Sequence, residues 1–382
     1  MRAYIWKMRI AIITLPLHAN YGGILQAYAL QTILKRMGHN VEIITLSCFL
    51  RIPLWRIPFT YIKRCSFKYL FGKKIRIFYE QWYNRTDPLL VIHMKCFIDE
   101  RIFIRFVNRY NDIKDGEYDA FIVGSDQVWR PQYFKSSIEN AYLAFAKKWK
   151  NVKRIAYAAS FGTDEWEYTL KQTKYCSKLV ELFDGVSVRE KTAVGLCEHY
   201  LHCKAQHVLD PTMLLTASSY YQLFMNKQLS PCDGQLLTYI LDENVETENI
   251  ILQLAAHFGY KPFRVNSRYE NYNAPLIERV QPSVEQWLKG FYEAEFIVTD
   301  SFHATIFAIL FRKPFIVIGN RERGLSRLHS LLCMFSLEKH FVFTSGQINF
   351  NMDYSIDTQE LDIILDKLRS DSIDYLTYHL RK

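Results

Sequence analysis

The stretch Glu293–Gly319 reads EAEFIVTDSFHATIFAILFRKPFIVIG and predicts a strand, a polar turn, a helix and a second strand. Its first apolar run, Phe296 to Val298, is short and β-branched, which is typical of a buried parallel strand. Asp300 and Ser301 are residue types that begin helices. The second apolar run, 315–318, follows the helix after Pro314. This β-α-β order predicts an α/β fold with a parallel sheet.

His303 lies in the first turn of that predicted helix, directly after Ser301 and Phe302. Open α/β sheets bind ligands at the carboxyl ends of their strands, and free backbone N–H groups at a helix start favour a phosphate. A histidine placed there can meet an anion and also move a proton. We therefore take His303 as a candidate catalytic residue, with Ser301 and Phe302 beside the substrate.

The composition is that of a globular protein of 382 residues, 49% hydrophobic and 23% charged. This length favours two domains, and no apolar run is long enough to span a bilayer. Eight scattered cysteines favour free thiols in a reducing cytoplasm over a disulfide framework. None of the cysteine and histidine spacings matches a standard zinc site, so we expect no metal.

Most of the net charge of +9 comes from one segment, Arg51 to Arg76, which holds eight lysines and arginines and no acid. Six aromatic residues, from Trp55 to Phe71, interleave with these cations. Such a mixture suits the inner face of a membrane or an anionic acceptor, and the alternative is a solvated insertion whose aromatic rings pack on the domain. No recognised motif supports nucleic acid binding.

The rest of the chain extends the α/β pattern on both sides of the opening stretch. The expected strands are 8–15, 41–46, 120–123, 154–159, 185–188, 207–209, 236–241 and 263–265, and the expected helices are 24–37, 246–258, 284–293, 361–368 and 373–380. We expect two doubly wound Rossmann-like domains, 1–212 and 213–382, that face each other across a cleft in a GT-B-like arrangement. The basic aromatic insertion, 48–80, interrupts the first domain.

Polar residues follow several of the predicted strands, and the carboxyl ends of parallel strands meet at one edge. Asn20, Gly22, Gly23 and Gln26 follow the first strand, where the glycines permit close approach of a ligand to the backbone, although a plain tight turn explains them as well. We count all four as candidate substrate contacts.

The segment Gly124–Arg130 follows another strand and offers a carboxylate, an amide and an indole: Asp126, Gln127 and Trp129. Such a set suits a sugar, and Asp126 is a candidate base for a sugar hydroxyl; the alternative for Trp129 is a place in the core. Ser160, in the small-residue segment 157–162, is a further candidate contact.

Three arginines are candidates for holding an anion. Arg189 ends the strand 185–188 and either binds a phosphate or carboxylate, or pairs with a neighbouring acid such as Glu190. Arg321 and Arg323 lie in a basic loop after the strand 315–318, and they either clamp an anion or form surface ion pairs.

Six motifs in a fixed order resemble the polysaccharide pyruvyltransferase family, over roughly residues 8–341. They are Asn20-Tyr-Gly-Gly with Gln26, Gly124-Ser-Asp-Gln-Val-Trp129, Tyr157-Ala-Ala-Ser-Phe-Gly162, Ser187-Val-Arg-Glu190, Leu209-Asp-Pro-Thr212 and Asp300-Ser-Phe-His303. Familiar members have Arg-Leu-His where this chain has Ser301-Phe302-His303. The resemblance therefore requires a cation from elsewhere, such as Arg189, Arg321 or Arg323.

The resemblance implies a transferase that moves the pyruvyl part of phosphoenolpyruvate to a sugar hydroxyl of a cell-surface polysaccharide or its lipid-linked precursor, forming a ketal. It implies no metal or other cofactor beyond the donor phosphoenolpyruvate, which the second domain would bind with His303. The first domain would bind the acceptor. Two alternatives stay open: a GT-B-type glycosyltransferase that uses a nucleotide sugar, and a non-catalytic glycan- or membrane-binding module.

Overall fold

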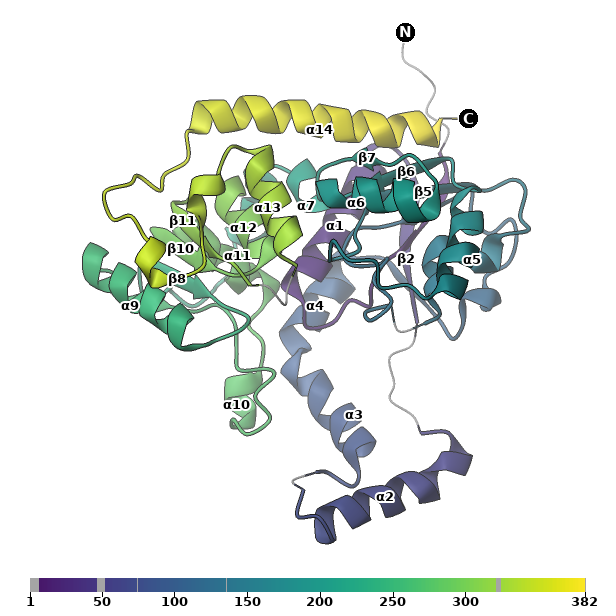
Figure 1. The fold of residues 1–382 in the computed structure, drawn as a ribbon, viewed down its shortest axis with the longest axis horizontal. Coiled ribbons are helices and arrows are strands. Elements are labelled where there is room, and N and C mark those ends of the chain that lie inside the picture. Colours follow the sequence, from purple (N-terminus) through teal and green to yellow (C-terminus); the bar gives the residue numbers. More distant parts are fainter. Residues whose placement is uncertain (1–6, 47–51, 74, 135, 321–323, 382) are drawn as a thin grey trace.

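The computed structural model contains two parallel sheets, each covered by helices (Figure 1), and it describes all residues except 1–6, 47–51, 74, 135, 321–323 and 382. The first sheet has the order β3 (Ile104–Val107), β2 (Asn40–Leu46), β1 (Arg9–Ile13), β4 (Ala120–Val123), β5 (Lys153–Ala159), β6 (Gly185–Val188) and β7 (Gln206–His207). The second has the order β12 (Phe341–Val342), β11 (Phe315–Ile318), β10 (Phe296–Thr299), β8 (Leu236–Tyr239) and β9 (Pro262–Phe263). All of the strand pairs are parallel, which confirms the predicted fold class.

The helices alternate with these strands as a doubly wound fold requires. They are α1 (Tyr21–Arg36), α2 (Ile57–Tyr69), α3 (Tyr79–Leu90), α4 (Ile92–Arg101), α5 (Leu170–Val180), α6 (Lys191–Leu196), α7 (Pro211–Leu214), α8 (Ala217–Phe224), α9 (Val245–Phe258), α10 (Leu276–Arg279), α11 (Val284–Glu293), α12 (Phe302–Leu310), α13 (Leu325–Met334) and α14 (Thr358–Leu380). No helix among the described residues is both long enough and apolar enough to cross a membrane.

The central strands are buried on both faces, so their side chains read as continuous apolar runs. Every residue of β4 is buried, and so is every residue of β10. One continuous apolar core joins the two domains, because it contains Ile24 of α1, Phe307 of α12 and Leu376 of α14. The two sheets are thus held together by apolar packing.

The last helix differs from the prediction of two separate pieces, 361–368 and 373–380. It is one helix, α14, that crosses from the second domain to the first (Figure 1). Polar side chains at its middle bind backbone of the segment 209–213, where the two domains join. Arg369 Nε donates to Met213 O at 2.6 Å, and Ser372 Oγ accepts from Leu209 N at 3.1 Å. The C-terminal helix therefore packs on the first domain, although it follows the second in sequence.

The insertion between β2 and β3 is more helical than the sequence suggested. It contains α2, α3 and α4, and the first two project from the body of the molecule (Figure 1). The strand β3 and the short strand β12 were also missed. Both lie at the edge of their sheets, where a strand is only half-covered and its apolar pattern is weak.

Candidate active site

The site begins at the turn between β10 and α12, and hydrogen bonds fix this turn. Ser301 is the N-cap of α12, and its side chain accepts from Ala304 N at 3.5 Å. The Asp300 carboxylate accepts from the backbone of Leu241 and Asp242, at 2.8 and 3.0 Å, and so ties the turn to the loop after β8. This anchoring holds the first turn of α12 at the edge of the sheet.

From that turn His303 reaches across to the first domain. Its Nε2 lies 3.7 Å from Asp210 Oδ2, and only 10% of its side chain is exposed. Its ring also packs against Gly22 at the start of α1: a Cβ added to Gly22 would lie 2.1 Å from His303 Nδ1. Gly22 is therefore a glycine because the histidine occupies the space that any side chain would need.

Asp210 is the centre of a buried network. Arg189 Nη1 donates to its Oδ2 at 2.9 Å, Ser125 Oγ donates to the same oxygen at 2.9 Å, and Thr212 Oγ1 donates to its Oδ1 at 2.6 Å. Burial alone would raise the pKa of Asp210, but His303, Arg189 and Thr212 together hold this pKa well below its usual range. The carboxylate is therefore charged, and it compensates the cations around it.

Two arginines flank Phe302. The guanidinium carbon of Arg189 lies 4.4 Å from the centre of its ring, and that of Arg327 lies 5.8 Å from it. Burial, together with repulsion by Arg189, lowers the pKa of Arg327 to about 10. For Arg189, burial acts in the same direction, but Asp210, Asp126 and Glu190 outweigh it and raise the pKa. An anion that bound here would stabilise the charge on Arg327.

Asp126 also lies beside this network, in a strained conformation. Its φ is +73°, which is rare for a residue other than glycine, and its Oδ1 accepts from Gln127 N at 2.9 Å. Its carboxylate lies 3.7 Å from Arg189 Nη2. Strain of this kind costs about 1–3 kcal/mol and tends to occur at functional sites.

Several buried polar atoms around this network form no hydrogen bond with the described residues. They are Nε and Nη2 of Arg189, Oε2 of Glu190 and Nε2 of His303. A buried polar group without a hydrogen bond costs about 1–3 kcal/mol, and folded proteins contain few of them. These donors and this acceptor lie close together, as they would in a binding site for a polar ligand.

A cavity of about 740 Å³ opens from His303 between the domains. His18, Asn20 and Gly22 of the first domain line it, together with Ser301, His303 and the loop 266–271 of the second. This cavity is large enough for a small anion and part of a sugar. Residues of both domains therefore meet at His303, as the sequence predicted for His303, Ser301, Asn20 and Gly22.

The structure places other expected contacts differently. Trp129 is fully buried, stacks on Tyr142 with ring centres 4.9 Å apart, and donates from Nε1 to Ala141 O, so its indole belongs to the core and is closed to a sugar. Gln26 is buried below the site and donates to Thr14 Oγ1 at 3.0 Å. Ser160 Oγ donates to Glu190 at 2.9 Å.

The remaining candidates lie at the edge of the site, away from the cavity, or outside the residues that the structure describes. Gly23 lies next to Asp126: a Cβ on it would be 3.5 Å from Asp126 Oδ2. Gln127 Oε1 accepts from Arg130 Nη1 at 3.2 Å, away from the cavity. Arg321 and Arg323 lie outside the described residues. Arg189 pairs with Asp210 and Asp126, not with Glu190 as its sequence neighbour suggested.

Two further residues of the site, Asp210 and Arg327, were not among the candidate residues chosen from the sequence. The sequence does mark Asp210, because Asp-Pro-Thr is a typical helix start and follows a strand that ends at the same edge of the sheet. Arg327 ends the basic loop that holds Arg321 and Arg323, but its burial against Phe302 depends on how α13 packs on α12.

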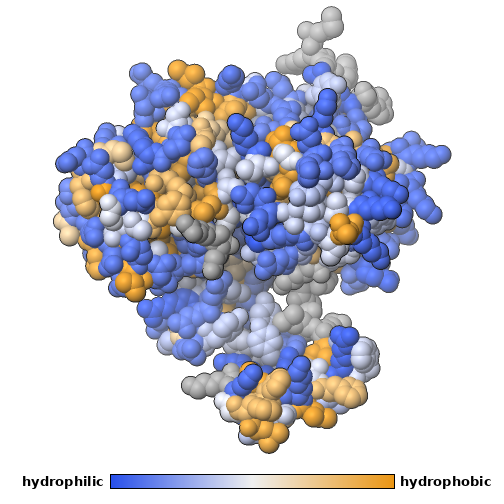
Figure 2. All heavy atoms as spheres, in the orientation of Figure 1, coloured by the Kyte–Doolittle hydropathy of each residue, from blue (hydrophilic) through white to orange (hydrophobic). Residues whose placement is uncertain are grey.

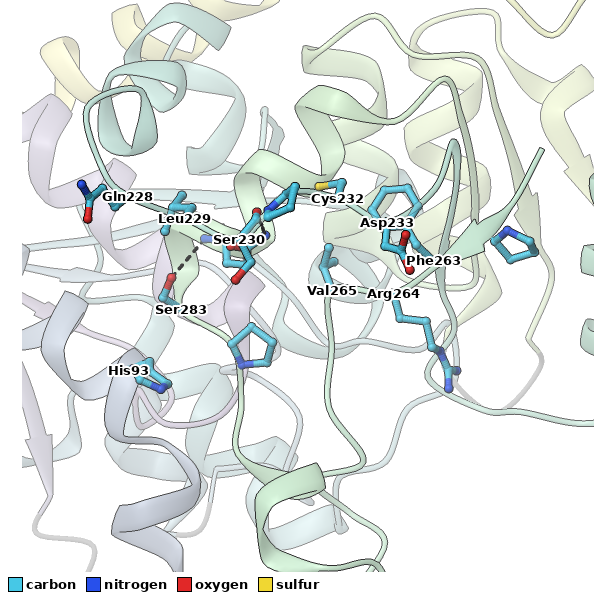
Figure 3. A pocket seen from close by; sticks show the side chains of 14 residues that line it. His93, Gln228, Leu229, Ser230, Cys232, Asp233, Phe263, Arg264, Val265 and Ser283 are labelled. Carbon is cyan, nitrogen blue, oxygen red and sulfur yellow. Dashed lines mark hydrogen bonds between the residues drawn. The ribbon is translucent and has the colours of Figure 1, made fainter.

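A second cavity of about 700 Å³ lies elsewhere, between β9, α4 and the segment 228–233. Figure 3 shows its labelled side chains, with His93 and Arg264 far apart at opposite ends. None of the residues that the sequence marked lines it. We therefore take the cavity at His303 as the candidate active site.

The UDP-GlcNAc 2-epimerase of Methanocaldococcus jannaschii is similar in structure, with 13% identity, a TM-score of 0.45, and coverage of 94% of this chain and 99% of the other. UGT89C1 of Arabidopsis thaliana complexed with quercetin shows 9% identity, a TM-score of 0.46, and coverage of 98% and 100%. Similarities of this size carry no information about activity.

Comparison with curated proteins finds no significant match. The profile of the family described as polysaccharide pyruvyl transferase, in contrast, matches residues 20–322. This range holds all six motifs, Asp210 and His303. The chain therefore belongs to the polysaccharide pyruvyl transferase family and is a transferase.

Proposed function

We propose that this protein transfers the pyruvyl group of phosphoenolpyruvate to a sugar hydroxyl of a cell-surface polysaccharide or its lipid-linked precursor, and that a pyruvate ketal is the product. One observation carries the proposal. His303 stands at the start of α12, 3.7 Å from the buried carboxylate of Asp210, and it lines a cavity between the domains. Its neighbour Phe302 carries two buried guanidinium groups on its ring.

The charged groups around His303 complement the two anionic groups of the donor. Phosphoenolpyruvate carries a phosphate and a carboxylate, and the first N–H groups of α12 can bind one of them. Arg327 supplies a cation for the other, because its lowered pKa makes the arrival of an anion favourable. Arg189 is balanced by Asp210 and Asp126 and mainly holds the network in place. These cations take the place of the arginine that Ser301-Phe302-His303 lacks.

The reaction needs an acid and a base. His303 gives a proton to the methylene carbon of phosphoenolpyruvate, and the central carbon becomes an electrophile. A sugar hydroxyl attacks this carbon and forms the new C–O bond, while Asp126 accepts the hydroxyl proton. The C–O bond to phosphate then breaks, and a second hydroxyl closes the ketal. One of the two hydroxyl protons restores the acid, and the other leaves with phosphate.

Asp210 has a supporting part in this scheme. Its carboxylate lies next to His303 Nε2, so its negative charge offsets the proton that the ring must carry before transfer. Gly22 keeps the ring in place from the other side. The acid thus stands between two domains, and a relative movement of the domains changes its position.

The test compares two donors on the purified protein. Phosphate release from phosphoenolpyruvate with a glycan acceptor, and a shift in melting temperature on adding phosphoenolpyruvate alone, are the expected results. His303→Gln keeps the size of the side chain and should lower phosphate release by about 10²–10⁴-fold. Release of nucleotide from a nucleotide sugar, with none of phosphate, would overturn the proposal in favour of a glycosyltransferase.

A further inference from the structure

The part of the insertion that contains α2 and α3 forms an arm outside the globular body. We call residues 52–90 the α2–α3 arm; it includes a short 3-10 turn, Leu54–Arg56, before α2. Neither this turn nor α2 has a buried residue. Figure 1 shows the arm projecting from the body, on the side opposite α14. A helix that is exposed along its whole length is expected to be polar, so apolar residues on it call for an explanation.

The outer face of α2 is apolar. Phe59, Ile62, Tyr69 and Leu70 follow one another at intervals of three, seven and one residues, which places them on one side of a helix. Their exposures lie between 67% and 77%, and Trp55 extends the same face. Figure 2 shows apolar atoms gathered at the end of the arm. Isolated exposed apolar residues are ordinary, but a continuous stripe marks a binding surface.

The inner face of α2 already has its partners at the start of α3. Arg64 donates two hydrogen bonds to Glu80 at the start of α3, both 2.7 Å long. Tyr61 packs edge-on against Phe78, with ring centres 5.1 Å apart. A helix that folds only for its own domain turns its apolar side inward. In α2 the ion pair between Arg64 and Glu80 faces α3, and the apolar stripe faces the solvent.

Cations border the stripe without matching acids. Arg56, Lys63, Lys68, Lys73 and Arg76 are exposed, and two of the guanidinium groups lie on tryptophan rings, Arg56 at 4.5 Å from Trp55 and Arg76 at 4.0 Å from Trp82. The acids of the arm are Glu80, which pairs with Arg64, and Asp87, which is buried at its base. A basic helix with aromatic side chains on one face is the pattern of a helix that lies in the headgroup region of an anionic bilayer.

The base of the arm is bonded to two residues that line the active-site cavity. Asp87 binds His18 Nε2 at 2.6 Å and accepts from Tyr269 OH at 2.7 Å. His18 belongs to the first domain and Tyr269 to the second, and both line the cavity that contains His303. The arm is therefore attached to the body beside this cavity.

We propose that the α2–α3 arm docks this protein on the surface of an anionic phospholipid bilayer. The apolar stripe enters the headgroup region and the bordering cations bind lipid phosphates. Docking by itself is independent of the reaction. Its use, to bring the cavity to a lipid-linked acceptor, rests on the function proposed above.

The test is flotation of the full-length protein with vesicles of phosphatidylcholine, with and without phosphatidylglycerol. We expect binding only to the anionic vesicles, and weaker binding at high salt. Lys63→Gln/Lys68→Gln/Lys73→Gln should lower the affinity by about a hundredfold, roughly fivefold for each cation. Phe59→Ser/Ile62→Ser should lower it on the order of tenfold or more without changing its salt dependence.

The matched control is Ile363→Ser/Lys367→Gln on α14, an equally exposed pair at the opposite side of the molecule, which should bind as the wild type does. Because the changed side chains are exposed, melting temperatures should agree among the variants. Equal binding by all of them would overturn the proposal. So would a conversion of dimer to monomer by Phe59→Ser/Ile62→Ser, or an equal loss of binding to a soluble acidic polysaccharide. None of these results depends on turnover of phosphoenolpyruvate.

Discussion

His303 Nε2 lies 3.7 Å from Asp210 Oδ2, and this pair joins the two domains at the point where the cavity ends. His303 begins a helix of the second domain, and Asp210 follows the last strand of the first. Each residue lies at the carboxyl edge of its own sheet. The candidate acid is therefore assembled only when the two domains are packed together.

Gly22→Ala should disable the site with little effect on the fold. The new methyl group would lie 2.1 Å from His303 Nδ1, so the ring must move. A displacement of about 1 Å can cost on the order of a hundredfold in rate, and we expect that loss in phosphate release. Gly195→Ala in α6 is the control, because its methyl group would meet none of the described residues within 4 Å. Equal activity of the two variants would contradict the placement of His303.

Asp210→Asn should destabilise the protein strongly. It leaves Arg189 buried with less compensating charge, and breaking a buried ion pair costs about 3–5 kcal/mol. Chemical unfolding of the variant measures this loss in the free energy of unfolding. Asp99→Asn, which breaks an exposed pair with Lys95, should change it by about 0.5 kcal/mol or less.

The same variant should also change how stability depends on pH. The pKa of Asp210 is lower in the folded protein than the unfolded value of about 3.9. Asp210 therefore contributes stability above that value, and the contribution is lost as the pH falls toward the folded pKa. Unfolding curves from pH 5 downward should fall less steeply for Asp210→Asn than for the wild type. Parallel curves would show that the carboxylate is not held in its charged form.

Arg327→Gln should weaken donor binding while the fold persists. A hydrogen bond to a charged group contributes about 1.5–3 kcal/mol, so we expect KM for phosphoenolpyruvate to rise about ten- to a hundredfold. In the wild type, binding should also weaken as the pH rises through about 10, where Arg327 loses its proton. Arg312→Gln, which removes an exposed cation paired with Asp362, is the control. An unchanged KM in Arg327→Gln would exclude Arg327 from the donor site.

Asp87→Ala should loosen the α2–α3 arm from the body. It removes the hydrogen bond from Tyr269 and the contact with His18, which link α3 to both domains alongside the hydrogen bond from Gln281 N to Leu90 O. Hydrogen exchange of the α3 amides should become faster, while α1 keeps its protection. The pKa of Tyr83, which burial and then Asp87 raise to about 12, should also fall toward its usual value. Unchanged exchange in α3 would mean that the arm is held by other contacts.

Local patterns in the sequence predicted most of the strands, because buried parallel strands are short apolar runs between polar turns. The strands 120–123, 185–188 and 315–318 and the helix 284–293 agree residue for residue with the structure. The errors lie where local pattern and tertiary contact disagree. Arg369 and Ser372 lie in the gap between the two predicted helical pieces, yet they are part of α14 and bind backbone of the segment 209–213. Trp129 follows a strand in a polar segment, yet its ring fills the core.

The sequence by itself determined the α/β class, the family and the position of His303 at a helix start, since each depends on residues close together in the chain. Tertiary structure alone decided what surrounds His303. Gly22, Asp210 and His303 are separated by many residues, and only domain packing brings them into contact. The pairing of Arg189 with Asp210, and the burial of Arg327 on Phe302, depend on the same packing. Charge compensation in a buried site is a property of distances in space, which spacing along the chain does not determine.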